Sequence, residues 1–182
     1  MRTLVSTFFS SLDGIVDAPH EWHFPYMDDE VMGVVGSTFA GCDALLMGRV
    51  TYQEWELHWS QQPRDGGMAD FINDTQKYVA STTLDSVDSW DNSTLIKGPV
   101  TDFVADLREQ DGGTIGVGGS PSLVRSLIEA RLLDELTLMI SPVVAGGGRR
   151  RLFPGDAAPA EFELAEATPT STGTLIATYR PA

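Results

Sequence analysis

The stretch that decides the fold is Thr114-Ile115-Gly116-Val117-Gly118-Gly119-Ser120-Pro121-Ser122-Leu123, a β-prone run that breaks on paired glycines and continues as a helix. Gly118 and Gly119 carry no Cβ, so backbone N–H groups can approach an anion closely, and the helix adds its positive N-terminal dipole. Ser120 is a predicted N-cap, and Pro121 suits the first helical position. A Gly-Gly turn of this kind is also common as a purely structural feature, so the phosphate-binding interpretation depends on the rest of the chain.

Strand and helix patterns alternate on both sides of this stretch. The spacing of apolar residues predicts strands at Thr3–Phe9, Ala44–Met47, Lys77–Ser81, Thr94–Ile96, Thr114–Val117 and Leu136–Ile140. Helices are predicted at Asp28–Phe39, Ala69–Thr75, Pro99–Gln110 and after Pro121, followed by a closing hairpin of Glu161–Ala165 and Thr172–Tyr179. This order predicts an α/β fold with a mostly parallel sheet, covered on both faces, and an antiparallel pair at its C-terminal edge.

Polar or glycine-rich residues follow four of the predicted strands. They are Asp13, Gly48-Arg49, Ser81-Thr82 and Gly118-Gly119. Sheets of this class bind ligands at the carboxyl ends of their strands. The sequence therefore predicts a single cleft at that edge.

The length of 182 residues fits one domain spanning 1–182. The longest apolar runs, such as Leu4–Phe9, are far shorter than the roughly 20 residues of a membrane span. The residues directly after Met1 have the pattern of a strand and do not show the charged lead and apolar region of a signal peptide. We therefore expect a cytoplasmic protein.

The negative net charge limits which ligands and partners the protein can bind. Twelve Lys+Arg against 26 Asp+Glu give a formal net charge of −14, which disfavours nucleic acid and anionic membranes as partners. An anionic cofactor then needs locally placed cations, and the candidates are Arg49 and the run Arg149-Arg150-Arg151, although a short arginine run is also typical of a solvated loop.

No metal site is expected. Cys42 is the only cysteine, which excludes an intramolecular disulfide and a cysteine-based metal cage. His20, His23 and His58 have no metal-like grouping with acidic residues.

Four motifs carry a resemblance to a known family. They are Ser11-Leu12-Asp13-Gly14, Met47-Gly48-Arg49-Val50-Thr51-Tyr52, Gly116-Val117-Gly118-Gly119-Ser120 and Ser141-Pro142-Val143-Val144-Ala145-Gly146-Gly147-Gly148-Arg149-Arg150. In this order and spacing, over essentially the whole chain, they resemble the dihydrofolate reductase-like fold and, within it, the stand-alone relatives of the RibD C-terminal reductase domain. Each motif alone is weak evidence.

The resemblance implies a three-layer α/β/α reductase that uses NADPH. It implies Arg49 near the adenosine 2′-phosphate with Ser81 and Thr82, and Thr51 with backbone amides near the pyrophosphate. It also implies a cis peptide bond between Gly118 and Gly119, as in similar reductases. The residues expected at the cofactor are Gly48, Arg49, Thr51, Ser81, Thr82, Gly116, Gly118, Gly119, Ser120 and Leu123.

The substrate side is carried by Trp22-His23-Phe24-Pro25-Tyr26-Met27-Asp28, which looks like the Trp-x-Leu-Pro-x-Asp segment of dihydrofolate reductases but is one residue longer. The acid that matches this segment is Asp28, or it is Asp29 or Glu30 if the alignment is shifted to absorb the extra residue. Alternatively, the acid has no role at the substrate and is only a first-turn residue favoured by the helix dipole. Trp22, Phe24 and Tyr26 suit stacking on a flat heterocycle, and core packing explains them almost equally well.

Proton delivery to the substrate is assigned to an acid, with Asp28 the first candidate and Asp13 the second. The pKa of Asp28 is expected to rise if the aromatic residues around it exclude water. Asp13 has a competing explanation as part of an Asp-Gly turn.

Taken together, the residues and the resemblance predict hydride transfer from NADPH to a pteridine, a pyrimidine of the riboflavin pathway or a flavin. The zinc signature of a deaminase is absent, so coupling to deamination is not encoded. The alternatives are a dihydrofolate or pterin reductase and a non-catalytic NADPH-binding protein. A homodimer is expected from the resemblance, from the apolar strand Leu136–Ile140 and from the exposed edge of the C-terminal hairpin.

Overall fold

Eight strands form one sheet in the order β4-β3-β2-β5-β1-β6-β8-β7 in the computed structural model, which describes residues 1–182. The strands are β1 Leu4–Ser11, β2 Cys42–Gly48, β3 Gln76–Ala80, β4 Ser93–Ile96, β5 Thr114–Gly118, β6 Glu135–Ser141, β7 Phe162–Pro169 and β8 Leu175–Pro181. The helices are α1 Asp29–Ala40, α2 Arg49–Trp59, α3 Met68–Asp74, α4 Val100–Glu109 and α5 Pro121–Glu129, with short 3₁₀ turns η1 Pro19–Glu21 and η2 Phe24–Tyr26.

The strand directions confirm the predicted architecture. β1 lies parallel to β5 and β6, and β2 lies parallel to β3 and β5. β8 is antiparallel to both of its neighbours, β6 and β7, so the C-terminal hairpin is the antiparallel part of an otherwise parallel sheet. β6 lies inside the sheet between β1 and β8, which explains the apolar run Leu136–Ile140 by burial within one subunit.

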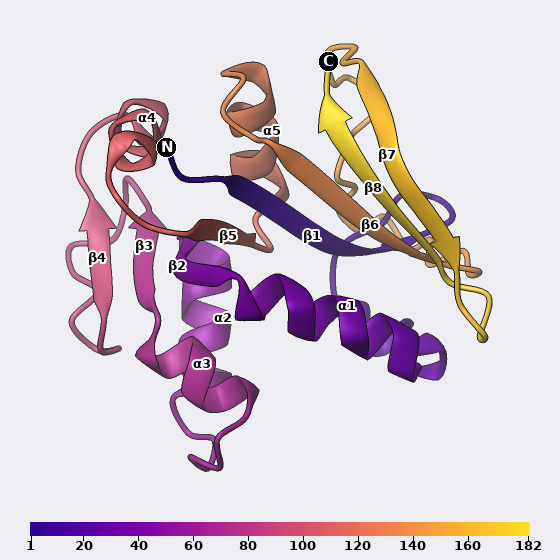
Figure 1. The fold of residues 1–182 in the computed structure, drawn as a ribbon, viewed down its shortest axis with the longest axis horizontal. Helices are drawn as coiled ribbons and strands as arrows, with labels where there is room; N and C mark the ends of the chain where they lie inside the picture. Colours follow the sequence, from indigo (N-terminus) through magenta and orange to yellow (C-terminus); the bar gives the residue numbers. More distant parts are fainter.

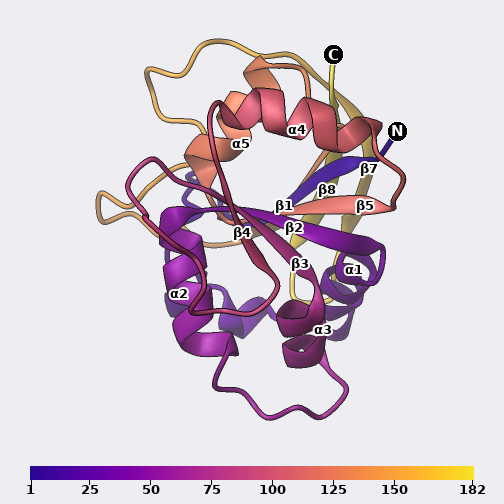
Figure 2. The same cartoon turned by 90° about the vertical axis from the view of Figure 1, so that its left-hand side faces the viewer.

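Helices cover both faces of the sheet. Figures 1 and 2 show α1, α2 and α3 on one face and α4 and α5 on the other, which confirms the three-layer arrangement. Neighbouring residues of β2 point to opposite faces, as strand geometry requires. Leu46 belongs to the cluster of 17 buried residues beneath α4 and α5, and Leu45 belongs to the cluster of seven that includes Tyr52 and Ile72.

The parallel strands bring their carboxyl ends to one edge of the sheet. β1 ends at Ser11, β2 at Gly48 and β5 at Gly118, and α2 and α5 each begin within three residues of the preceding strand. The loops that carry the predicted site therefore start from the same edge. None of the helices has the length and apolar character required to cross a bilayer.

Candidate functional site

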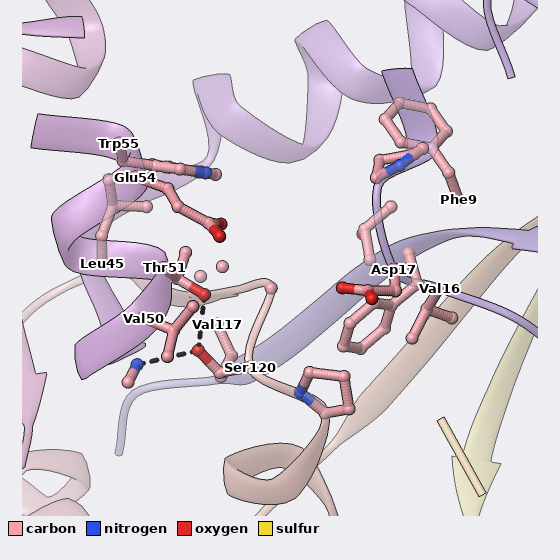
Figure 3. Close-up of a pocket in the computed structure, with 18 of the residues that line it drawn as sticks. Phe9, Val16, Asp17, Leu45, Val50, Thr51, Glu54, Trp55, Val117 and Ser120 are labelled. Carbon is pink, nitrogen blue, oxygen red and sulfur yellow. Dashed lines mark hydrogen bonds between the residues drawn. The ribbon is translucent and has the colours of Figure 1, made fainter. Parts of the chain in front are cut away.

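A cavity of about 360 Å³ opens at this edge, between α1, α2 and the segments that follow β1 and β5. Its wall is largely apolar (Figure 3), and the apolar side chains include Phe9, Val16, Leu45, Val50, Trp55 and Val117. An apolar pocket with a few polar groups at its rim is the usual form of a site for a small organic ligand.

The first turns of α2 and α5 meet at the rim of this cavity. The Gly48 N–H donates to Ser120 Oγ at 2.8 Å, and the hydroxyls of Thr51 and Ser120 lie 2.9 Å apart (Figure 3). The N–H groups of a first helical turn have no partner inside the helix, and they carry the positive end of its dipole. Two such ends therefore converge beside one cavity.

The backbone between β5 and α5 turns through two successive left-handed residues, Gly119 at φ +51° and Ser120 at φ +58°. A Cβ at Gly119 would lie 2.7 Å from Thr51 Oγ1, and one at Gly118 would lie 3.2 Å from the Trp55 ring. The predicted cis bond between Gly118 and Gly119 is wrong, because the structure contains no cis peptide bond and the left-handed pair already reverses the chain.

Ser120 occupies the predicted N-cap position of α5, and Pro121 is the first helical residue. The Ser120 hydroxyl makes no capping bond, because it accepts from Gly48 and contacts Thr51 instead. The first amides of α5 are therefore left to another acceptor. Free amides, two converging dipoles and a glycine that no side chain can replace together fit a phosphate or diphosphate group.

Six of the ten residues expected at the cofactor line the cavity: Gly48, Thr51, Gly116, Gly118, Gly119 and Ser120. Arg49 is exposed on the first turn of α2, and its Nη1 donates to Gln53 Oε1 at 3.1 Å. Ser81 and Thr82 directly follow β3, beside β2 in the sheet, and the Ser81 hydroxyl accepts from the amides of Thr83 and Leu84. Leu123 is 7 % exposed and packs in the core beneath α5.

Asp28 does not line the cavity but caps α1. Its carboxylate accepts the Val31 N–H at 2.8 Å and the Thr172 hydroxyl at 2.7 Å. Partial desolvation opposes ionisation of Asp28, but these hydrogen bonds outweigh it and hold the pKa well below its usual range. The expected rise in this pKa is therefore wrong, because hydroxyls and amides surround the carboxylate in place of aromatic rings.

Asp13 also makes a structural set of bonds. It accepts the Ser11 hydroxyl at 2.6 Å and the amides of Ala145 and Gly146, each at 3.0 Å. These hydrogen bonds, that of Ser11 first, lower the pKa of Asp13 to about 2. Asp13 thus ties the turn after β1 to the loop after β6.

The three aromatic residues assigned to the substrate lie outside the cavity wall. Trp22 is buried, and its Nε1 donates to the Asp17 carbonyl at 3.0 Å. Phe24 is 64 % exposed, and Tyr26 lies in η2 with its carbonyl accepting from Thr172. The structure does not bring the three rings together as one stacking surface.

Two acids that the sequence reasoning did not select line the cavity instead. Figure 3 shows the carboxylates of Asp17 and Glu54 pointing into it, one from the loop after β1 and the other from α2. Asp17 pairs with Arg150 at 2.8 Å, whereas Glu54 has no hydrogen-bond or ion-pair partner. The signal for Glu54 was its spacing from Thr51, since residues three apart share one helical face.

Comparisons with known proteins agree with this architecture. A family model described as the RibD C-terminal domain matches residues 2–176. The uncharacterized protein YyaP of Bacillus subtilis is 26 % identical over 152 residues, which cover 81 % of this chain and 79 % of YyaP.

Two solved structures share the fold. A pyrimidine reductase-like protein from Corynebacterium diphtheriae has a TM-score of 0.70 at 12 % identity and covers 99 % of this chain and 92 % of its own. Dihydrofolate reductase from Enterococcus faecalis, complexed with NADP(H), has a TM-score of 0.65 at 15 % identity and covers 98 % of this chain and 96 % of its own.

Proposed function

Because the chain belongs to the RibD C-terminal domain family, we propose that it is a reductase that transfers hydride from NADPH to a heterocyclic substrate held in the cavity. The observation that carries the proposal is the meeting of α2 and α5 at the rim, through the contacts of Ser120 with Gly48 and Thr51. A helix N-terminus binds phosphate groups, so two converging helix ends suit a diphosphate, and the apolar cavity beside them suits flat rings.

The cofactor's phosphates would be held by backbone amides. The first turn of α2 and the turn Gly118–Ser120 both line the cavity, and the Thr51 hydroxyl contacts that of Ser120 where they meet. Arg49 begins α2 and is free to turn from Gln53 toward a 2′-phosphate, with Ser81 and Thr82 at the end of the neighbouring strand. When bound, NADPH supplies the hydride.

The chain's own residues orient the heterocycle and hold the proton. Trp55, packed over Gly118, gives a flat apolar wall, and the carboxylate of Asp17 accepts an N–H donor at the rim of a pyrimidine or pteridine ring. Hydride addition to a C=N or C=O bond leaves negative charge that needs a proton. We assign that proton to Glu54, because Asp17 is held by Arg150 and the carboxylates of Asp28 and Asp13 are bound within the fold.

The test is the loss of NADPH absorbance with a panel of pterins, aminopyrimidines and flavins, each against a reaction without acceptor. We expect turnover with at least one class and a preference for NADPH over NADH. Arg49→Ala should remove most of that preference, about tenfold in affinity, since a guanidinium–phosphate contact is charge-assisted. Arg131→Ala, an exposed arginine two residues beyond the end of α5, is the matched control.

Two results would contradict the proposal. Binding of NADPH without turnover on any acceptor would identify a non-catalytic nucleotide-binding protein. Absence of NADPH binding would remove the cofactor assignment altogether.

A further inference from the structure

Lys77, on β3, is one of only two lysines in the chain, and its side chain is completely buried. It forms no ion pair, and the nearby carboxylate of Asp74 pairs with Arg64 instead. A buried ammonium group without a counter-charge is rare in proteins, because removing it from water is costly. The fold must therefore stabilise this charge by other means.

Backbone carbonyls and an aromatic ring take the place of a counter-charge. The ammonium group donates to the carbonyls of Ile72 at 3.0 Å, Asn73 at 3.1 Å and Thr75 at 2.8 Å. It also lies 4.7 Å from the centre of the Trp90 ring. The last carbonyls of α3 have no partner inside the helix, and they carry the negative end of its dipole. Three hydrogens of the ammonium group thus match three carbonyls, whereas a neutral amine has only two hydrogens to donate.

The two segments that Lys77 joins are those against which α2 packs. At the end of α3, the Asn73 amide donates to the carbonyl of Trp59, the last residue of α2, at 2.9 Å, and its oxygen accepts from the Trp90 indole at 2.7 Å. The Trp90 ring also packs against Tyr52 in the first turn of α2, with the ring centres 5.8 Å apart. Figure 1 shows α3 beside α2 on the same face of the sheet. Helix α2 is therefore held near both of its ends.

Helix α2 in turn carries Thr51, Glu54 and Trp55 to the cavity. We propose that Lys77 is a positioning residue for this helix: its ammonium group holds the end of α3 and Trp90 together, and through them it fixes the side chains of α2 at the cavity. Lys77 does not line the cavity itself. The inference deepens the proposed function and rests on it where NADPH affinity is measured, whereas the packing of α2 can be measured without a ligand.

The wild-type protein provides the first test, because the charge of Lys77 depends on pH. Burial lowers the pKa of Lys77 from 10.5 to about 8. The charges of Asp74 on α3 and Asp91 before β4 oppose this change, and that of Arg64 before α3 adds to it. Above this pH one of the three carbonyls loses its donor. We therefore expect the NADPH affinity, measured by calorimetric titration, to fall by about threefold or more between about pH 7 and about pH 9.

Loss of the fold would not explain this fall in affinity. The folded protein releases the Lys77 proton near pH 8 and the unfolded chain releases it near pH 10.5, so the contribution of Lys77 to the free energy of unfolding rises with pH over that interval. A purely structural role therefore predicts an NADPH affinity that holds or improves above pH 8. The positioning role predicts an affinity that falls.

Lys77→Met removes the charge and keeps an unbranched apolar side chain in the same space. This variant should have the weaker NADPH affinity at every pH and should lose the pH dependence of the wild type. Lys97→Met is the matched control, because Lys97 is the other lysine of the chain and is exposed just after β4. It should bind NADPH as the wild type does. If Lys77→Met does not fold, the pH dependence of the wild type decides the inference.

Amide hydrogen exchange of the ligand-free protein, followed by mass spectrometry at neutral pH, locates the effect. Helices α2 and α3 should exchange faster in Lys77→Met than in the wild type, and α4 and α5, on the other face of the sheet, should be unchanged. Faster exchange in all helices would indicate general destabilisation and overturn the positioning role. A wild-type NADPH affinity that does not fall above pH 8 would also overturn it. If the protein binds no NADPH at all, the proposed function fails, and the exchange of α2 alone then decides this inference.

Discussion

Glu54 reaches the cavity from α2, one helical turn beyond Thr51, and its carboxylate has no partner in the fold. If Glu54 delivers the proton, Glu54→Gln should lower kcat by about 10²-fold on a substrate that needs protonation, with NADPH affinity unchanged. Steady-state kinetics with a validated acceptor provides the measurement of kcat, and a fluorescence titration provides that of the NADPH affinity.

Glu56→Gln is the matched control, because Glu56 lies on the same helix but does not line the cavity. Full turnover by Glu54→Gln would exclude Glu54 as the proton donor. Asp28→Asn should have a different effect from Glu54→Gln. Because the Asp28 carboxylate caps α1, its loss should lower the stability of the fold more than the turnover.

His23 carries a prediction of pH-dependent stability. Its ring is 1 % exposed, stacks 4.0 Å from Phe9 and contacts Ser141 Oγ through Nδ1 at 2.6 Å, while Nε2 has no partner. Burial lowers the pKa of His23 from 6.5 to about 4, against the opposing charge of Asp28. The folded protein therefore holds a neutral imidazole where the unfolded chain takes up a proton.

The contribution of His23 to the free energy of unfolding should consequently be level above pH 6.5 and should fall by about 3 kcal/mol as the pH drops from 6.5 to about 4. Urea unfolding across that range provides the measurement. His23→Phe should flatten the slope, whereas His20→Phe, with His20 67 % exposed, should leave it. An identical slope in His23→Phe would show that other groups set the pH dependence. Asp13 does not interfere, since its lowered pKa moves its contribution below this range.

At the scale of elements, the turn between β5 and α5 depends on Gly119. Gly119→Ala adds a methyl group 2.7 Å from Thr51 Oγ1 at a φ of +51°, so the start of α2 must move away from α5. We expect the NADPH affinity to fall tenfold or more, measured by fluorescence titration, with a stability loss of about 1 to 2 kcal/mol.

Gly66→Ala is the control that separates the backbone strain of a positive φ from the steric contact with Thr51. Gly66 also has a positive φ, +83°, but nothing lies within 4 Å of its Cβ position and it does not line the cavity. It should cost a similar strain and leave the NADPH affinity intact. Equal affinities in both variants would show that the Gly119 turn does not hold the cofactor.

Most elements were predictable because their apolar periodicity is strong and local. The pattern Val31, Val34, Val35 indicated α1, and the bounds of most elements lie within one to three residues of the prediction. The helical character of α2 beyond Tyr52 was not assigned, since its exposed face is polar and aromatic. The 3₁₀ turns η1 and η2 leave too short a pattern to detect.

The parts of the candidate site that were predictable from sequence are those formed by the backbone of glycine turns. The glycines Gly48 and Gly118 end β2 and β5 just before a helix, and they marked the edge of the sheet where the cavity lies because a strand–glycine–helix pattern is local in sequence. The choice among acids depends on tertiary contacts. In sequence, Asp28 and Glu54 are both acids near a helix, and only the contact of Asp28 with Thr172 makes one structural and leaves the other facing the cavity.

At the scale of the whole molecule, β7 is an edge strand that pairs only with β8, and seven of its eight residues are exposed. Such an edge offers unpaired N–H and C=O groups to another strand, and Leu164, 57 % exposed, adds an apolar side chain. We predict that a second copy of the chain covers this hairpin. Light scattering at micromolar concentration should then give twice the chain mass of 19.7 kDa.

Leu164→Glu tests whether β7 forms the contact, because charges on an edge strand oppose pairing between strands. The variant should shift the mass toward the monomer and keep the cavity intact, since Leu164 lies on the hairpin and does not line it. Leu57→Glu, at a leucine 79 % exposed on α2, is the control and should remain dimeric. A monomeric wild type would contradict the dimer. A dimer unaffected by Leu164→Glu would place the contact away from β7, and the other edge strand, β4, would be the next surface to test.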